Sequence, residues 1–232
     1  MATRLGTQFF SQTTRQVARQ LLGKRLVRIT NDGTRLSGLV VEVEAYLPHG
    51  DLASHSHRGM SKKNAAMFSE PGRLYVYSIH AKHCLNVVTE AAGQGAAVLI
   101  RALEPSEGTQ PMLEHRGLFA NGSIDGSLPA AIDLKTAIAL TSGPARLCQA
   151  LGIDRSYDGL NLVTDQRVWL ENAPAITFPS RVITRGPRIG ISQSTALPLR
   201  WYLDGHHFVS GLARAHPRGR HWNFSTGLSR LG

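Results

Sequence analysis

The sequence predicts a single α+β domain with many short strands and few helices. Its 232 residues suit one large domain, and 42% of them are hydrophobic, which is enough to bury a substantial core. Runs of β-branched and aromatic residues between turn residues predict the strands. The predicted strands are 25–29, 39–47, 73–79, 84–88, 96–103, 168–170, 188–191, 199–203 and 208–209.

Two helices are predicted from their end signals. Thr13 or Thr14 can cap the start of a helix. The helix is expected to end before Gly23, because the residue that follows a helix often has a left-handed backbone, which glycine adopts easily. A second helix is expected over 143–151, capped by Ser142 and with a proline in its first turn.

The domain is expected to cover residues 1–211. Residues 104–133 are rich in Gly, Ser and Pro, and 120–130 within them are expected to be a flexible insertion. From residue 212 onward the pattern dissolves into Arg, His, Gly and Ser. The prediction for 212–232 is therefore a flexible basic tail without regular structure.

The charge of the chain favours a polyanionic partner. The formal net charge is +10 and the isoelectric point is near 10.3. Residues 1–31 hold six Lys or Arg and no acid, and residues 181–232 hold eight against one acid, Asp204. Nucleic acid is the expected partner, because each neutralised phosphate releases counterions. The alternative is a soluble protein that is merely basic.

Nothing in the sequence predicts a membrane or secreted protein. No apolar run approaches the ~20 residues that span a bilayer, and no basic amphipathic helix has a large apolar face. The N-terminus lacks the apolar segment of a secretory signal. Cys84 and Cys148 make no disulfide framework and are expected to be reduced thiols. We therefore expect a cytoplasmic protein.

The segment 39–47 carries the first candidate site residues. Side chains alternate along a strand, so one face is wholly apolar while Glu42, Glu44 and Tyr46 share the other, with neighbours roughly 7 Å apart. A lone strand carboxylate is usually a solvated surface group, but for two beside a tyrosine a functional site is an equal alternative. Arg101 interrupts an otherwise buried strand pattern, and a buried charge needs a partner or a function.

Other site types are less well supported. A zinc site could be built from the pairs His55/His57 and His80/His83 with Cys84, but the spacing resembles no standard zinc site, and we expect no metal. No phosphate-binding glycine loop and no Gly-x-Ser-x-Gly nucleophile motif occurs.

The remaining candidates combine carboxylates, flat side chains and basic charge in or beside neighbouring strands. An enzyme that acts on a base in duplex DNA must flip it out, stack it and read its edge. Hydrolysis of the N-glycosidic bond then needs a carboxylate to activate water. The residues that fit this chemistry are Glu42, Glu44, Tyr46, His55, Tyr75, Tyr77 and Arg101.

Several colinear blocks resemble the alkyladenine (3-methyladenine) DNA glycosylase family, which are monofunctional purine-lesion glycosylases. The similarity runs in order from about residue 4 to residue 210. The blocks are Arg4-Leu5-Gly6, Phe9-Phe10, Val41-Glu42-Val43-Glu44-Ala45-Tyr46-Leu47, Ala53-Ser54-His55-Ser56, Met67-Phe68, Pro71-Gly72-Arg73-Leu74-Tyr75-Val76-Tyr77, Asn86-Val87, Leu99-Ile100-Arg101-Ala102-Leu103-Glu104-Pro105 and Ser142-Gly143-Pro144-Ala145-Arg146-Leu147-Cys148-Gln149-Ala150-Leu151.

The resemblance implies which residues act on the lesion. Glu44 matches the catalytic carboxylate, and Arg101 matches the basic residue beside the catalytic water and the lesion phosphate. Tyr46 would stack on the base and His55 would hydrogen-bond it. Glu42 matches no assigned role and is expected to be structural.

Two further pocket residues follow from the same resemblance. Tyr77 would stack on the opposite face of the base, and Asn86 would crowd the exocyclic amino group of normal guanine. The family usually has a wedge tyrosine where this chain has His80, in a segment one residue shorter. His80 is the expected wedge, with His83 or Leu85 as alternatives.

The function implied by the resemblance is that of a base excision repair glycosylase. The implied fold is one domain with a curved, mostly antiparallel sheet, open-barrel-like, and surrounding helices. The implied partner is double-stranded DNA with damaged purines such as 3-methyladenine, 7-methylguanine or hypoxanthine. No cofactor and no lyase activity are expected, and the protein is expected to be a monomer, associated with the nucleoid through DNA if it is bacterial. The alternatives are a non-catalytic damaged-DNA-binding module and a carbohydrate glycosidase that uses Glu42 and Glu44.

Overall fold

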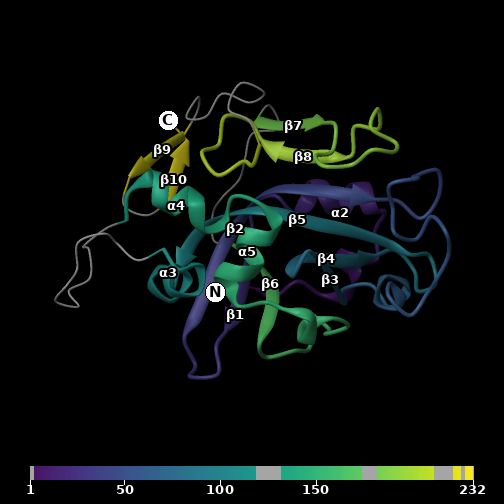
Figure 1. Cartoon of the computed structure of the whole chain (residues 1–232), viewed down its shortest axis with the longest axis horizontal. Helices are drawn as coiled ribbons and strands as arrows, with labels where there is room; N and C mark the ends of the chain where they lie inside the picture. The colour runs from purple at the N-terminus through teal and green to yellow at the C-terminus, as the bar shows by residue number, and fades with distance from the viewer. Residues whose placement is uncertain (1–2, 119–131, 174–181, 212–221, 226–227, 232) are drawn as a thin grey trace.

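An antiparallel sheet forms the centre of the molecule (Figure 1). The computed structural model describes residues 3–118, 132–173, 182–211, 222–225 and 228–231. In these residues eight strands form one sheet with the order β3-β4-β5-β2-β1-β6, and β8 pairs with β2 and β7. The strands are β1 (Lys24–Ile29), β2 (Arg35–Tyr46), β3 (Leu74–Ile79), β4 (Lys82–Thr89), β5 (Ala96–Glu107), β6 (Val168–Asn172), β7 (Ile183–Gly186) and β8 (Arg200–Leu203).

Strand β2 is the strand around which the sheet is built. One edge of β2 pairs with β5 over residues 37–46. The other edge pairs first with β1, over 35–39, and then with β8, over 42–44. The carboxyl-terminal half of β2, which carries the two glutamates, is therefore enclosed by strands on both edges.

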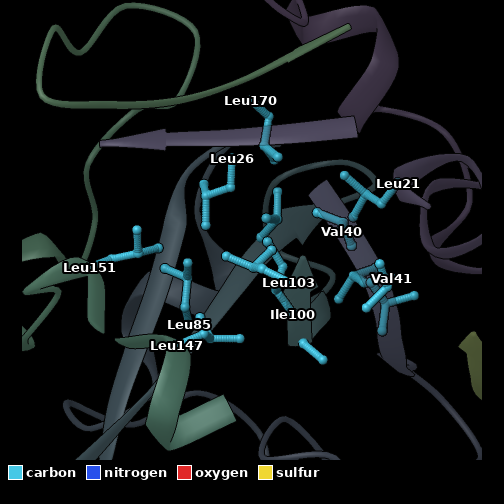
Figure 2. Packing of buried hydrophobic residues seen from close by; sticks show 14 of the residues in the cluster. Leu21, Leu26, Val40, Val41, Leu85, Ile100, Leu103, Leu147, Leu151 and Leu170 are labelled. Carbon is cyan, nitrogen blue, oxygen red and sulfur yellow. The ribbon is translucent and has the colours of Figure 1, made fainter. Parts of the chain in front are cut away.

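Helices cover the sheet and close the core. Helix α2 packs on β2 and β5, and α5 packs on β4 and β5 with α3 and α4 beside it. Figure 2 shows leucines from α2, β1, β6 and α5 gathered around Ile100 and Leu103 of β5, all fully buried. The helices are α1 (Thr7–Phe10), α2 (Thr14–Leu21), α3 (Thr109–Arg116), α4 (Leu134–Thr141) and α5 (Pro144–Leu151), with 3-10 turns η1 (Ala65–Phe68) and η2 (Arg155–Tyr157).

The predicted α+β class and the mostly antiparallel sheet are confirmed. Thr13 caps α2 through a capping box with Gln16, and Gly23 follows the helix with a φ of 79°. The turn at 31–34 connects β1 and β2 as a hairpin, as its Asp-Gly sequence predicts.

Some element predictions are wrong. Residues 188–191 and 208–209 are not strands, although Arg188 and Phe208 are buried. The 104–133 stretch is more regular than predicted, because β5 extends to Glu107 and α3 follows it. The N-cap of α5 is Gly143 rather than Ser142.

Two predictions concern segments that lie partly or wholly outside the described residues. The insertion at 120–130 lies outside the described residues. Within 212–232, where no regular structure was predicted, two short strands pair with each other, β9 (Trp222–Ser225) and β10 (Leu228–Leu231). Strand β10 lies against β5, and the flexibility of the tail stays a prediction.

Two features of the described residues concern membranes and metal ions. None of the helices in this part of the chain combines the length and apolar character that a bilayer crossing requires. The same residues contain no group of three or more His, Cys, Asp or Glu side chains arranged to hold a metal ion.

Candidate active site

The acidic and basic candidate residues meet between two neighbouring strands. The register between β2 and β5 shifts on both sides of Glu42, so that Val41 and Arg101 have no directly opposite residue in the pairing of these two strands. Such bulges bend a strand and re-aim its side chains. Here the Arg101 guanidinium lies between two carboxylates, with Nε 3.0 Å from Glu42 and Nη1 3.2 Å from Glu44.

Glu44 is fully buried and is held by three donors. The backbone N–H of Ile189 donates to Oε1 at 2.7 Å, Arg101 lies against the same oxygen, and the Tyr46 hydroxyl donates to Oε2 at 3.0 Å. Burial raises the pKa of Glu44 above its ordinary 4.5, while the three donors oppose this by favouring the charged form. A carboxylate with a raised pKa is suited to accept a proton near neutral pH.

Glu42 points at the same arginine but has a different set of partners. It accepts from Arg101 Nε at 3.0 Å, from Arg200 Nε at 2.6 Å and from the backbone N–H of Ser210 at 2.7 Å. All of these groups are buried. Glu42 thus ties β5, β8 and the 210 region together, which agrees with its predicted structural role.

Tyr46 links the acidic cluster to an aromatic one. Its hydroxyl donates to Glu44, and its ring lies 4.6 Å from the Arg188 guanidinium carbon. Burial and the neighbouring Glu44 carboxylate raise the pKa of Tyr46, so the phenol stays protonated and remains a donor.

The predicted base-binding residues line one small cavity. It is lined by Tyr46, His55, Met67, Tyr75, Tyr77 and Asn86, and it leaves about 10 Å³ of free space. Asn86 is fixed at its edge, because its Nδ2 donates to the backbone oxygen of Tyr75 at 2.9 Å. A purine is far larger than this space, so a base can enter only if the surrounding side chains move apart.

Three aromatic side chains pack closely around this cavity. The rings of Tyr75 and Tyr77 stack with centroids 5.4 Å apart, and the His55 ring meets Tyr77 edge to face at 4.5 Å. His55 Nδ1 lies 2.8 Å from the Tyr75 hydroxyl oxygen. Partial burial lowers the pKa of His55 and raises that of Tyr75 to about 12, so both groups are neutral at pH 7.

A larger cavity opens beside the small one. It has a volume of about 630 Å³ and shares His55, Tyr75 and Tyr77 with the inner cavity. Its outer wall adds two cationic side chains, Lys63 and Arg155. The aromatic cluster thus lines both a narrow pocket and a wider cavity that holds two cationic side chains, of which Arg155 pairs with Asp158 at 3.2 Å.

His80 lies apart from both cavities, at the tip of the β3–β4 hairpin. Ile79 pairs with Lys82, which leaves His80 and Ala81 as a two-residue turn with φ values of 47° and 61°. Both turn residues are exposed, and so is Ile79.

The two alternatives for the wedge fit this geometry less well. Leu85 is completely buried in the core, so it is wrong as an alternative. His83 pairs with Ser78 inside the hairpin rather than at its tip.

Several residues of the site were missed in the sequence. Arg188 and Arg200 lie in the basic region 181–232, where the excess of charge suggested phosphate contacts. Both are instead buried in ion pairs, with Asp51 and Glu42 respectively. Ser210 adds a backbone donor to Glu42. The sequence held only a weak sign of these contacts. Arg200 has apolar neighbours in its predicted strand, which indicates that its side chain is buried, as for Arg101.

Comparisons with known proteins agree with this arrangement. The methylpurine-DNA glycosylase (MPG) family pattern matches residues 8–207. The chain is 49% identical to a putative 3-methyladenine DNA glycosylase of Rhodopirellula baltica over 216 residues, which are 93% of this chain and 87% of that protein. It is 43% identical to the mouse DNA-3-methyladenine glycosylase, covering 91% of this chain and 62% of the mouse protein. It is 41% identical to the human DNA-3-methyladenine glycosylase, covering 91% and 70% respectively. The chain therefore belongs to the methylpurine-DNA glycosylase family.

Proposed function

We propose that this protein, a DNA-3-methyladenine glycosylase of base excision repair, hydrolyses the N-glycosidic bond of a flipped alkylated purine with a water activated by Glu44. One observation carries the proposal: a buried carboxylate with a raised pKa lies beside Arg101 and accepts a hydrogen bond from Tyr46, which lines an aromatic pocket. A carboxylate has about four acceptor positions, and three described donors contact Glu44. In the proposed mechanism, the attacking water takes the fourth position.

The reaction separates a base from its sugar without a covalent enzyme intermediate. Glu44 takes a proton from water as the oxygen attacks C1′ of the deoxyribose, and Arg101 orients the carboxylate and the water. The C1′–N bond breaks, and its electron pair leaves with the purine. The product is an abasic site, and no strand cleavage follows, because no lysine matches a position that could form an imine with the sugar.

Alkylated purines are the proposed substrates because of their charge. A purine alkylated at N3 or N7 carries a positive charge, so its glycosidic bond is already weakened and its departure neutralises it. Tyr46 and Tyr77 would stack on its two faces, with Asn86 excluding the amino group of normal guanine. Hypoxanthine is neutral and must be protonated as it leaves, so we expect slower release of this base.

The hairpin tip is proposed to fill the space that the flipped base leaves. His80 is a flat side chain held outside the protein by a tight turn, and exposed Ile79 adds apolar surface beside it. Inserted side chains of this kind separate neighbouring bases, at a cost of a few kcal/mol in stacking.

The test is release of free base from duplexes that contain 3-methyladenine, 7-methylguanine or hypoxanthine. We expect Glu44→Gln to lower the single-turnover rate by about 10²–10⁴-fold, because the amide cannot accept the proton. Glu171→Gln is the matched control, since Glu171 is also a buried, arginine-paired acid but lies on β6 at the opposite edge of the sheet from β3. A Glu44→Gln rate within threefold of the wild type would refute the mechanism.

The alternatives predict other outcomes in the same assay. A non-catalytic module would retain damaged DNA for hours without base release, and family membership argues against it. A carbohydrate glycosidase needs two carboxylates that flank the scissile bond. Glu42 and Glu44 instead converge on one guanidinium, so they are not placed as such a pair.

A further inference from the structure

A completely buried ion pair lies directly behind the proposed base-binding ring. Arg188 Nη1 and Nη2 donate to the two oxygens of Asp51 at 2.7 and 2.6 Å, and neither side chain has any exposed surface. Arg188 comes from the loop between β7 and β8, and Asp51 from the loop after β2. The pair thus joins two loops that are far apart in the sequence.

The arginine side of the pair contacts Tyr46 directly and adjoins a donor to Glu44. The guanidinium carbon lies 4.6 Å from the centre of the Tyr46 ring, and Nη1 also donates to the backbone oxygen of Ala45 at 3.0 Å. The next residue, Ile189, donates its backbone N–H to Glu44 at 2.7 Å. The position of Arg188 therefore fixes both the ring and one of the three donors to the carboxylate.

The aspartate side of the pair shapes the loop that carries His55. Asp51 Oδ2 accepts from the backbone N–H of Leu47 at 3.0 Å, and Oδ1 accepts from that of Ala53 at 3.2 Å. The backbone oxygen of Asp51 accepts from Ser54 at 3.0 Å, immediately before His55. Each of the two carboxylate oxygens of Asp51 therefore accepts one hydrogen bond from Arg188 and one from a backbone N–H of this loop.

We propose that the Arg188–Asp51 pair is a positioning device that sets Tyr46, Glu44 and His55 relative to one another. The inference rests on the proposed function, because these three residues are its stacking, catalytic and base-edge groups. Arg188 and Asp51 do not act on the substrate themselves. They transmit the position of one loop to the other, and small displacements of reacting groups cost large factors in rate.

A purely stabilising role explains the arrangement less well. Burying two charges costs desolvation energy that the attraction between them only partly returns, and hydrophobic replacements are often as stable. The pair is nevertheless bidentate, fully enclosed and bonded to the backbone at the end of β2 and in the loop after it. Its contacts converge on the groups that perform the proposed reaction.

Two conservative variants test the proposal in the whole protein. Asp51→Asn keeps the shape but removes the charge and turns one acceptor into a donor. Arg188→Lys keeps the charge but loses the planar fork that spans two carboxylate oxygens and stacks on the ring. The double variant completes a cycle, and Glu171→Gln is the control because it alters a buried arginine-paired acid elsewhere in the sheet.

Four measurements distinguish positioning from stability. They are the single-turnover release of 7-methylguanine, the affinity for an undamaged duplex, the thermal unfolding curve and the pH profile of the rate. We expect each single variant to be folded at the assay temperature, to bind undamaged DNA within about threefold of the wild type and to release base roughly 10- to 100-fold more slowly. The double variant should be little slower than the singles, because the pair acts as a unit.

The pH profile adds a readout that a structural role would not change. Loosening Arg188 weakens the Ile189 N–H bond to Glu44, and loss of a donor to a carboxylate raises its pKa. The acidic limb of the pH–rate profile, where the rate rises as Glu44 ionises, should therefore move to higher pH in both single variants. It should stay unchanged in Glu171→Gln.

The outcomes also separate this inference from the proposed function. Failure of the wild type to release any alkylated base overturns the proposed function. An active wild type with an inactive Glu44→Gln, but with Asp51→Asn and Arg188→Lys at the wild-type rate and pH profile, overturns only the positioning role. The same holds if both variants fail to fold, or if their loss of rate equals their loss of folded protein.

Discussion

Glu44 shows how a residue's surroundings decide its chemistry. Burial raises its pKa above 4.5, and the base must be ionised to accept a proton. The single-turnover rate should therefore rise with pH along a limb whose midpoint lies above 4.5. The rate of base release from a duplex with 7-methylguanine, measured over a pH series, gives this midpoint. A midpoint at or below 4.5 would contradict the assignment of Glu44 as a buried proton acceptor.

Tyr46 offers a separate test of the same carboxylate. Its hydroxyl donates to Glu44 at 3.0 Å and favours the charged form, so Tyr46→Phe removes a group that lowers the pKa of Glu44. The acid limb should move to higher pH in Tyr46→Phe while the ring still stacks. His55→Gln is the control, since in the described part of the chain His55 bonds to Tyr75 and not to Glu44, so an unchanged limb is expected. An equal shift in both variants would show that the limb does not report on Glu44.

The sequence revealed single residues better than the contacts between them. Arg101 could be selected because it interrupts a buried strand pattern, and the two glutamates because they share a strand with an aromatic residue. Asp51 could not be selected, because it lies in a loop, where charged residues are usually solvated, and Arg188 begins a segment that was wrongly predicted to be a strand. Their pairing depends on the loop after β2 meeting the loop before β8, which no local pattern encodes.

At the scale of the elements, the close approach of β2 and β5 depends on Gly38. A Cβ at this position would lie 2.9 Å from the backbone oxygen of Glu104 and 3.0 Å from the Cβ of Leu103. Gly38→Ala should therefore destabilise the protein by about 1–3 kcal/mol, because the two strands must move apart. Urea unfolding measures the loss of stability. Gly6→Ala is the control, because a Cβ added at Gly6 would have no atom within 4 Å. Equal unfolding midpoints for the two variants would contradict the close approach.

The β3–β4 turn carries backbone strain that a single substitution can remove. Ala81 has a φ of 61°, and a left-handed conformation costs a non-glycine residue roughly 1–2 kcal/mol. Ala81→Gly relieves this strain but gives the unfolded chain more entropy, which offsets part of the gain, so the net stabilisation should be about 0.5–1 kcal/mol. Thermal unfolding measures the change, and His80→Ala provides a comparison that keeps a left-handed non-glycine residue. Destabilisation by Ala81→Gly would show that the turn is not left-handed.

Elements with a clear period or end signal could be predicted, and those defined by tertiary contact could not. Helix α2 has a capping box and a terminal glycine, so its bounds follow from local sequence. Helix α3 begins after a left-handed glycine, Gly108, and contains a proline near its start, which resembles a loop. It becomes a helix where Met112 and Leu113 can pack beside α5. Strand β2 extends further than predicted because β1 and β5 pair with its polar beginning.

At the scale of the whole molecule, the net charge of +10 overstates the surface available for DNA. Arg101, Arg188 and Arg200 are buried in ion pairs with acids and cannot reach phosphates without breaking them. The composition predicted a polyanionic partner, but it could not separate internal from external cations. Lys63 and Arg155, which line the wide cavity beside the aromatic cluster, are exposed cations next to the proposed base pocket.

Binding to undamaged duplex DNA should therefore depend steeply on salt. Each phosphate contact contributes about −0.9 to the slope of log K against log salt, so four contacts weaken binding about a hundredfold between 50 and 200 mM salt. Lys63→Ala should reduce the magnitude of this slope by about 1. Arg35→Gln should leave it unchanged, because Arg35 pairs with Glu107 and Glu171 and lies at the start of β2, whereas the site residues of this strand lie in its second half. Fluorescence anisotropy across a salt series measures all three slopes. A flat wild-type slope would show that the surface cations do not contact the DNA phosphates. An equal reduction of the slope in both variants would show that the phosphate contacts are not concentrated at the cavity.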